Sequence, residues 1–172
     1  MTVLVSGQDF IDFVQGYKHT AFRLERQERY NEPEEDEPFR RFLAGEPVRG
    51  WNDEWESDMR RRTADGQRMI RVRIVTEPHG DYTRFLMELA RINVAAGEDI
   101  RYLARHQAKG LDLPEDDFWL IDSTRVGIMR FRDDASLIGA EVFDDPAVVI
   151  GHCYYRDVAC HYAVPFSEYA GS

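Results

Sequence analysis

The chain contains very little lysine. Of its 22 basic residues only Lys18 and Lys109 are lysines, and 32 acidic residues give a formal net charge of −10. A protein that binds nucleic acid in general needs a basic surface to neutralise phosphates, so this charge argues against direct nucleic-acid binding. The preference for arginine has two interpretations. One is a GC-rich genome, and the other is a need for the forked contacts that guanidinium makes with carboxylate or phosphate.

Long apolar runs are absent as well. No run approaches the roughly 20 residues that span a bilayer. The first residues lack the basic start and apolar middle of a signal peptide. Cysteine is scarce, and Cys153 and Cys160 are expected to be reduced thiols in an intracellular protein. The sequence therefore predicts a cytoplasmic protein without a membrane partner.

The signatures of common enzyme chemistry are also missing. Neither glycine-rich phosphate loop, G-x-x-x-x-G-K-[ST] or G-x-G-x-x-G, is present, and no G-x-S-x-G or H-E-x-x-H occurs. His152-Cys153 and Cys160-His161 offer zinc-ligand residue types. On one helix, however, the two cysteines would stand about 10 Å apart, too far for both to hold one ion by themselves. We therefore expect no catalytic residue, no metal and no cofactor.

The 172 residues predict a single α/β domain. Strand–helix–strand order over 69–103 predicts one parallel, right-handed crossover, and short turns after 121 and 131 predict an antiparallel meander. We expect a mixed sheet of about five strands with packed helices. In this scheme residues 1–66 form a mainly helical N-terminal section and residues 67–172 carry the sheet. Helices are predicted at 8–17, 38–44, 51–64, 81–96 and 146–163, strands at 69–75, 99–103, 117–121, 125–131 and 137–143, and a weaker strand pattern covers 21–26.

The predicted strand at 69–75 carries charge on one side. Its apolar residues alternate with Arg71 and Arg73, so the two arginines share a face. A parallel sheet buried on both faces usually has continuous apolar strands. The arginine face is therefore solvated, covered by polar groups, or part of a pocket. If the next strand pairs in register, Asp99 and Arg101 lie on the same face.

The turn after this strand is the second part of the candidate site. Ligands of open α/β sheets bind at the carboxyl ends of strands, and Asp81 suits the N-cap of the following helix. One interpretation is an arginine–carboxylate network with Asp99, Glu77 or acids of the N-terminal half. The other is a site for an anionic small molecule or an acidic protein segment. The candidate binding residues are Arg71, Arg73, Glu77, His79, Asp81, Tyr82, Arg84, Asp99, Arg101 and Trp119.

Segments along nearly the whole chain carry a family resemblance. They include AFRLE at 21–25, FLAGEP at 42–47, RVR at 71–73, GEDIR at 97–101 and DFWLID at 117–122. Together they resemble an uncharacterised family of small proteins of high-GC Gram-positive bacteria, often encoded beside helix-turn-helix regulators. The resemblance implies such a regulator as a partner. It implies no activity.

The order strand, helix, strand, followed by DFWLID and further strands, is also similar to phospholipase-D-like domains. Degenerate versions of these domains serve as sensors in some transcriptional regulators. The active enzymes use a histidine, a lysine two residues later and an aspartate beyond, whereas His106 and Lys109 are three apart. The expected function is thus a non-catalytic binding module, a sensor or partner of a regulator. The alternative is a small phosphodiester- or nucleotide-processing enzyme that uses His79 or His106 with Arg71 and Arg73.

Overall fold

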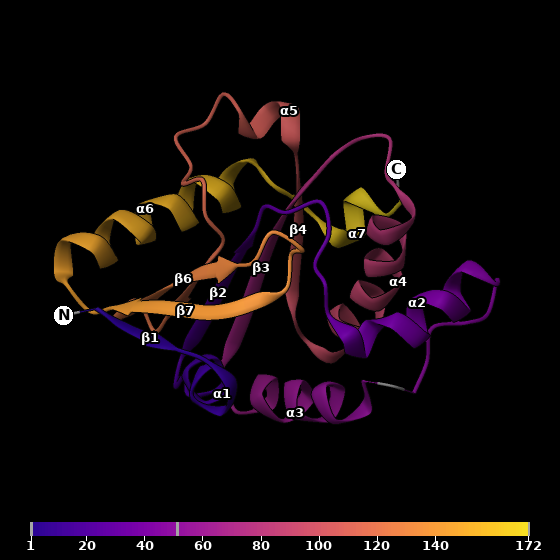
Figure 1. Ribbon diagram of the computed structural model, residues 1–172, viewed down its shortest axis with the longest axis horizontal. Helices are drawn as coiled ribbons and strands as arrows, with labels where there is room; N and C mark the ends of the chain where they lie inside the picture. Colours follow the sequence, from indigo (N-terminus) through magenta and orange to yellow (C-terminus); the bar gives the residue numbers. More distant parts are fainter. Residues whose placement is uncertain (1, 51, 172) are drawn as a thin grey trace.

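One mixed sheet of eight strands forms the centre of the molecule, in a computed structural model that describes residues 2–50 and 52–171 (Figure 1). The strands are β1 (Val3–Val5), β2 (Thr20–Glu25), β3 (Arg68–Val75), β4 (Asp99–Ala104), β5 (Phe118–Ile121), β6 (Arg125–Phe131), β7 (Leu137–Phe143) and β8 (Val164–Pro165). Their order across the sheet is β1-β7-β6-β5-β2-β3-β4-β8.

Helices cover both faces of the sheet. They are α1 (Gly7–Gln15), the 3-10 turn η1 (Pro33–Glu35), α2 (Asp36–Leu43), α3 (Asp53–Ala64), α4 (Asp81–Ala96), α5 (Arg105–Ala108), α6 (Pro146–Tyr162) and α7 (Phe166–Tyr169). The bounds of α4 are those predicted. Trp51, the expected first apolar residue of the third helix, lies outside the described residues. No helix in the described part of the chain has both the length and the apolar character needed to cross a bilayer.

The sheet combines a parallel half with an antiparallel half. β2, β3 and β4 are parallel neighbours, whereas β5, β6 and β7 form the predicted antiparallel meander. The prediction of about five strands is wrong because β1 and β8 have only three and two residues, too few for a recognisable alternation. A second parallel crossover, from β2 through η1, α2 and α3 to β3, was also missed, and it places β2 in the middle of the sheet.

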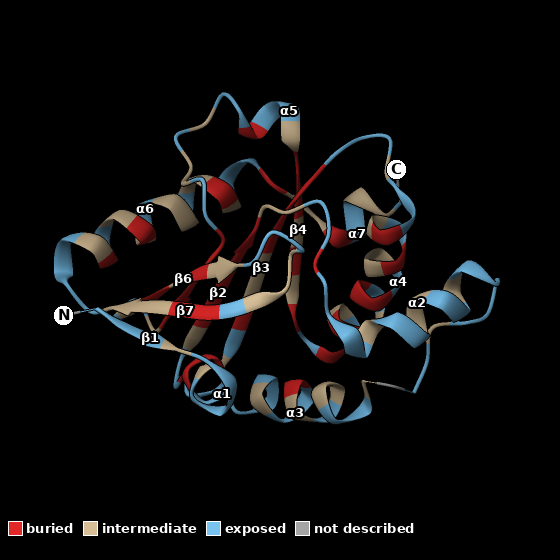
Figure 2. Ribbon diagram, in the orientation of Figure 1, coloured by how far each residue is buried: buried red, intermediate tan, exposed pale blue. Residues whose placement is uncertain are grey.

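The two faces of the sheet differ in chemistry. One face packs apolar residues such as Phe22, Val72 and Leu120 against α6 and α5. The opposite face is apolar under α1 and α3, where Phe13 and Met59 pack, but it carries charged side chains on β2 and β3. Figure 2 shows how thoroughly the central strands are buried. Charged groups on this second face are therefore enclosed by the helices above them.

The register between β3 and β4 overturns one expectation. Arg71 lies beside Ile100 and Arg73 beside Tyr102, so Asp99 and Arg101 point to the opposite face. Alternation along β4 shows only that residues 99 and 101 share a face. Which face it is depends on the pairing register with β3, and a register shift of one residue moves both side chains to the other face.

Candidate functional site

Strands β2 and β3 bring three arginines and a glutamate to one face of the sheet. In their parallel pairing Arg23 lies beside Arg71, and Glu25 lies beside Arg73. Alternation along both strands points all four toward the side covered by α1, α3 and α4. Their side chains are only 9 to 12% exposed. Charges so deeply buried need partners close by.

Arg71 and Arg73 share Glu25 as a partner. Arg71 donates from Nη1 to Glu25 and from Nε to Oε1 of Glu98, the latter over 2.7 Å. Nε of Arg73 lies 2.9 Å from Oε2 of Glu25. Burial by itself would raise the pKa of Glu25, but the guanidiniums of Arg73 and Arg71 outweigh it and lower that pKa to about 2. Glu25 is therefore held as a carboxylate.

Arg23 forms the second half of the network with Asp117, which precedes β5. Nη2 of Arg23 lies 3.0 Å from Oδ2 of Asp117. The same carboxylate accepts hydrogen bonds from the Tyr30 hydroxyl and, over 2.8 Å, from the Arg26 amide. The guanidinium of Arg23 also lies 5.4 Å from the centre of the Trp119 ring. We call Arg23, Glu25, Arg71, Arg73, Glu98 and Asp117 the arginine network.

A cavity of about 340 Å³ lies over the arginine network. We call it the inner cavity. Its volume falls within the usual range for small-molecule sites, and its mixture of aromatic rings with a few polar groups is typical of them. Its lining includes Arg23, Glu25, Arg71, Arg73 and Trp119 from the sheet, Phe10, Trp55, Tyr82, Leu86, Leu89 and Asn93 from the helices, and Tyr30, Glu32, Glu34 and Glu35 from the segment after β2.

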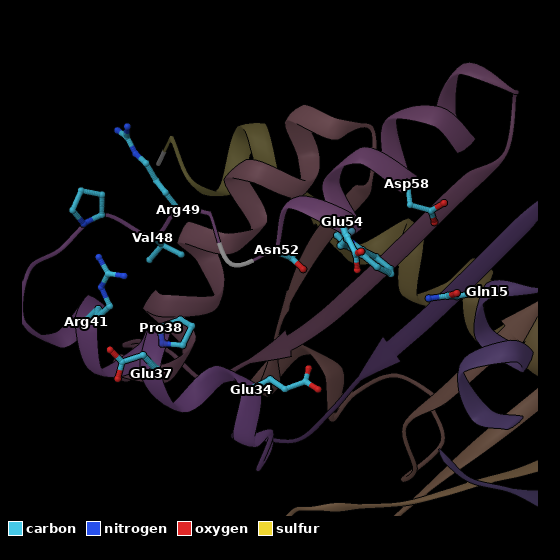
Figure 3. Close-up of a pocket in the computed structure, with 12 residues that line it drawn as sticks. Gln15, Glu34, Glu37, Pro38, Arg41, Val48, Arg49, Asn52, Glu54 and Asp58 are labelled. Atoms are coloured by element: carbon cyan, nitrogen blue, oxygen red, sulfur yellow. The ribbon is translucent and has the colours of Figure 1, made fainter. Parts of the chain in front are cut away.

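A larger, more superficial groove of about 840 Å³ adjoins the inner cavity. Figure 3 shows its walls, with Glu34, Glu37 and Arg41 on the side of η1 and α2 and Asn52 and Glu54 on the side of α3. The groove and the inner cavity share Glu34, Asn52 and Trp55 as lining residues. We place the candidate site in the inner cavity, because buried charges and several aromatic rings meet there in a volume large enough for a small molecule.

Glu35 stands out among the acids of the inner cavity. It is half-buried, and the Tyr82 hydroxyl donates to its two oxygens over 3.1 and 3.3 Å. Burial raises the pKa of Glu35 to about 7, although the hydrogen bond from Tyr82 partly opposes the rise. Burial also raises the pKa of Glu32, with a further contribution from the charge of Glu34. Near neutral pH, Glu35 is therefore poised between its protonated and ionised forms.

Four of the residues expected at the site line the inner cavity, namely Arg71, Arg73, Tyr82 and Trp119. Sequence reasoning did not name their neighbour Arg23 or their carboxylate partner Glu25, although the network interpretation allowed for acids of the N-terminal half. A signal for both was present, because Arg23-Leu24-Glu25 alternates charged and apolar residues as Arg71-Val72-Arg73 does. Nothing in the local pattern of residues 32–35 indicated that these acids line a cavity over the sheet.

The other six expected residues lie elsewhere. His79 and Glu77 both hydrogen-bond the Tyr169 hydroxyl over 2.7 Å. Arg84 pairs with Asp81 and donates to the His79 carbonyl. Arg101 pairs with Asp99 over 2.9 Å on the opposite face of the sheet. The N-cap of α4 is Gly80, and Asp81 is the first residue of the helix, so the expected capping role of Asp81 is wrong. Arg71 and Arg73 pair with Glu25 and Glu98, and not with Asp99 or Glu77 as one interpretation of the sequence had it.

The described residues contain no group of three or more His, Cys, Asp or Glu side chains placed to hold a metal ion. Cys153 and Cys160 both lie on α6, half-buried, with free thiols.

The charge on Glu25 should make folding sensitive to acid. Because its folded-state pKa is depressed from 4.5 to about 2, its ionised form stabilises the fold above pH 4.5. That contribution, about 3 kcal/mol, is lost as the pH falls from 4.5 toward 2. We expect Glu25→Gln to flatten this part of the pH dependence, measured by urea unfolding at pH 2 to 6. Glu141→Gln, at a surface carboxylate paired with Arg130, is the control. Equal slopes for wild type and Glu25→Gln would contradict the assignment.

Comparison with known proteins supports the fold. The solved structure of NucT from Helicobacter pylori matches with a TM-score of 0.55 and 9% sequence identity, over 96% of this chain and 97% of that chain. At this identity the likeness shows the fold alone. No curated protein matches the sequence. Residues 8–171 match the family described as "Domain of unknown function (DUF6879)", and the chain belongs to that family.

Proposed function

We propose that the protein is a cytoplasmic, non-catalytic module that binds a small molecule in the inner cavity. The observation that carries the proposal is a cavity of about 340 Å³ with aromatic walls over a floor of ion-paired charged groups. Such a floor is held rigid by its ion pairs, and a rigid, partly preformed site reduces the entropic cost of binding.

The positions of the histidines favour binding over catalysis. His79 contacts Tyr169 and His106 lies on the short helix α5, so neither lines the inner cavity. Nowhere does the chain place a lysine two residues after a histidine. The alternative, a phosphodiester- or nucleotide-processing enzyme, has the likeness to NucT in its favour, but that likeness extends to the fold only.

A sensor role with a helix-turn-helix regulator completes the proposal. Its motivation is the family resemblance of the sequence segments, whose relatives are often encoded beside such regulators. The inner cavity gives this role a physical basis. Segment 32–35 and helix α3 lie over the cavity without belonging to the sheet, so a ligand beneath them would change the surface that they present to a partner.

Filling the inner cavity should abolish binding without unfolding the protein. Leu86 lines the cavity, half-buried, from α4, and Leu86→Trp would place an indole there. In a thermal-shift screen of metabolites, we expect some ligands to raise the melting temperature of the wild type and to have no effect on Leu86→Trp. Glu88→Trp, at an exposed position on the same helix, should respond as the wild type does. Ligands that stabilise all three proteins equally would place the binding site elsewhere.

A further inference from the structure

The charges around the inner cavity are unevenly compensated. Every arginine of its floor is paired with a buried carboxylate. At the segment after β2, by contrast, no ion pair joins Glu32, Glu34 or Glu35 to a basic side chain among the described residues. Within residues 2–50 and 52–171, Glu35 has only the neutral Tyr82 hydroxyl as a hydrogen-bond donor. Among the lining residues of the inner cavity, the charge without an ion-pair partner is therefore negative.

An anionic ligand fits this arrangement poorly. To reach Arg71 or Arg73 it would have to displace Glu25, whose pKa of about 2 reflects how strongly the two guanidiniums hold it. It would also have to pass three glutamates. Anion binding, which two arginines on one strand led us to expect, loses its advantage once those arginines already have carboxylate partners.

Aromatic rings accompany the acids. Phe10, Tyr30, Trp55, Tyr82 and Trp119 all line the inner cavity. The electron-rich faces of such rings attract cations, most strongly where water is excluded. Guanidiniums of the protein already lie 5.4 to 5.7 Å from the ring centres of Trp119 and Tyr82. Tyr30 and Tyr82 are each 9% exposed and Trp119 is 4% exposed, so the rings provide an apolar enclosure as well.

The raised pKa of Glu35 is consistent with a carboxylate that has no cationic partner. The groups that face it are Glu32 from its own segment, Tyr82 from α4, and Glu25 and Arg73 from the sheet. Burial and the two glutamates raise the pKa of Glu35, while Tyr82 and Arg73 lower it, and the net result is about 7. The positive charge of a cation beside this carboxylate would offset the rise.

We propose that the inner cavity binds an organic cation with an apolar body, of the alkyl- or aryl-ammonium class. Its charge lies against Glu35 and Glu32, and its body lies against Trp55 and Tyr82. This inference rests on the proposed function and adds the chemical class of the ligand.

Three probes of similar shape and different charge test the inference: phenyltrimethylammonium, the neutral tert-butylbenzene and the anion benzenesulfonate. Trp55 and Trp119 line the cavity, so quenching of tryptophan fluorescence reports binding. We expect the cation to bind at least tenfold more tightly than the neutral probe, and the anion to bind more weakly still. Glu35→Gln should weaken binding of the cation at least tenfold. Glu88→Gln, at an exposed glutamate of α4, should leave it unchanged.

The pH dependence provides a second readout. Phenyltrimethylammonium keeps its charge at every pH, so any change in affinity reports on the protein. Because the cation favours ionised Glu35, whose pKa is about 7, affinity should rise between pH 5.5 and 7 and level off above. In Glu35→Gln this rise should be absent. A flat profile in the wild type would overturn the assignment of Glu35.

The outcomes separate this inference from the proposed function. Preference for benzenesulfonate would overturn the cation class while leaving a ligand-binding cavity in place. A second result would also overturn the cation class and leave the cavity as a binding site: none of the three probes binds, but some metabolites bind and lose their binding in Leu86→Trp. If no compound of any charge binds in a manner sensitive to Leu86→Trp, both the ligand class and the proposed function fail.

Discussion

Arg71→Met should lower the free energy of unfolding by about 3 to 5 kcal/mol, the usual cost of removing one partner from a buried ion pair. Arg71 is the guanidinium that joins Glu25 to Glu98, and the Glu98 side chain is 0% exposed. Methionine retains most of the volume but leaves two buried carboxylates with a missing partner. Urea unfolding at neutral pH measures the loss.

A surface arginine provides the matched control for this substitution. Arg40 pairs with Glu37 at the surface, where both side chains are more than half exposed. Arg40→Met should therefore leave the unfolding midpoint almost unchanged. In addition, Glu98→Gln combined with Arg71→Met should be less damaging than the sum of the single changes, because the two residues interact directly. A loss below about 1 kcal/mol for Arg71→Met would mean that water reaches the network and screens it.

Gly97→Ala should destabilise the fold by about 3 kcal/mol or more, because a strained backbone and overpacking add together. Gly97 ends α4 with φ of +120°, in the left-handed region that favours glycine. A Cβ at this position would also lie 2.2 Å from Oγ1 of Thr63 on α3. The close approach of these two helices is what allows α3 to reach over the inner cavity.

Gly66 separates the two causes. It also has a positive φ, +85°, but an added Cβ would meet nothing within 4 Å. Gly66→Ala should therefore show the backbone cost alone, about 1 to 2 kcal/mol. Thermal and urea unfolding of both variants give the comparison. Equal losses in the two proteins would show that α3 moves away from α4 without cost and that the helix contact contributes little.

Elements with strong periodicity were predictable from the sequence. The apolar periodicity of residues 81–96 predicted both ends of α4, and the short turns of the meander predicted β5, β6 and β7. The central strand β2 gave only a weak pattern because it buries Arg23 and Glu25 among apolar residues. Local alternation does not show whether a charged residue will find a partner on another strand. The two-residue β8 has no pattern to recognise.

The candidate site was predictable from the sequence only in part. Arg71 and Arg73 were identified because two charges interrupt an apolar strand. Glu25 and Glu98 are their actual partners, and the register that brings these groups together is a property of the whole sheet. The contribution of segment 32–35 depends on a tertiary fold-back. The composition of such an acidic run fits a solvated loop as well as it fits a segment that lines a cavity.

The strand order has a consequence for how the chain folds during synthesis. β2 ends at Glu25, but its antiparallel neighbour β5 begins only at Phe118. β1 pairs with β7, which ends at Phe143. Contacts between residues so distant in sequence close slowly. On the ribosome, Val3 to Val5 therefore emerge long before β7, and the charged residues of β2 long before β5. Until then the buried arginines and glutamates remain in water, and the inner cavity does not yet exist.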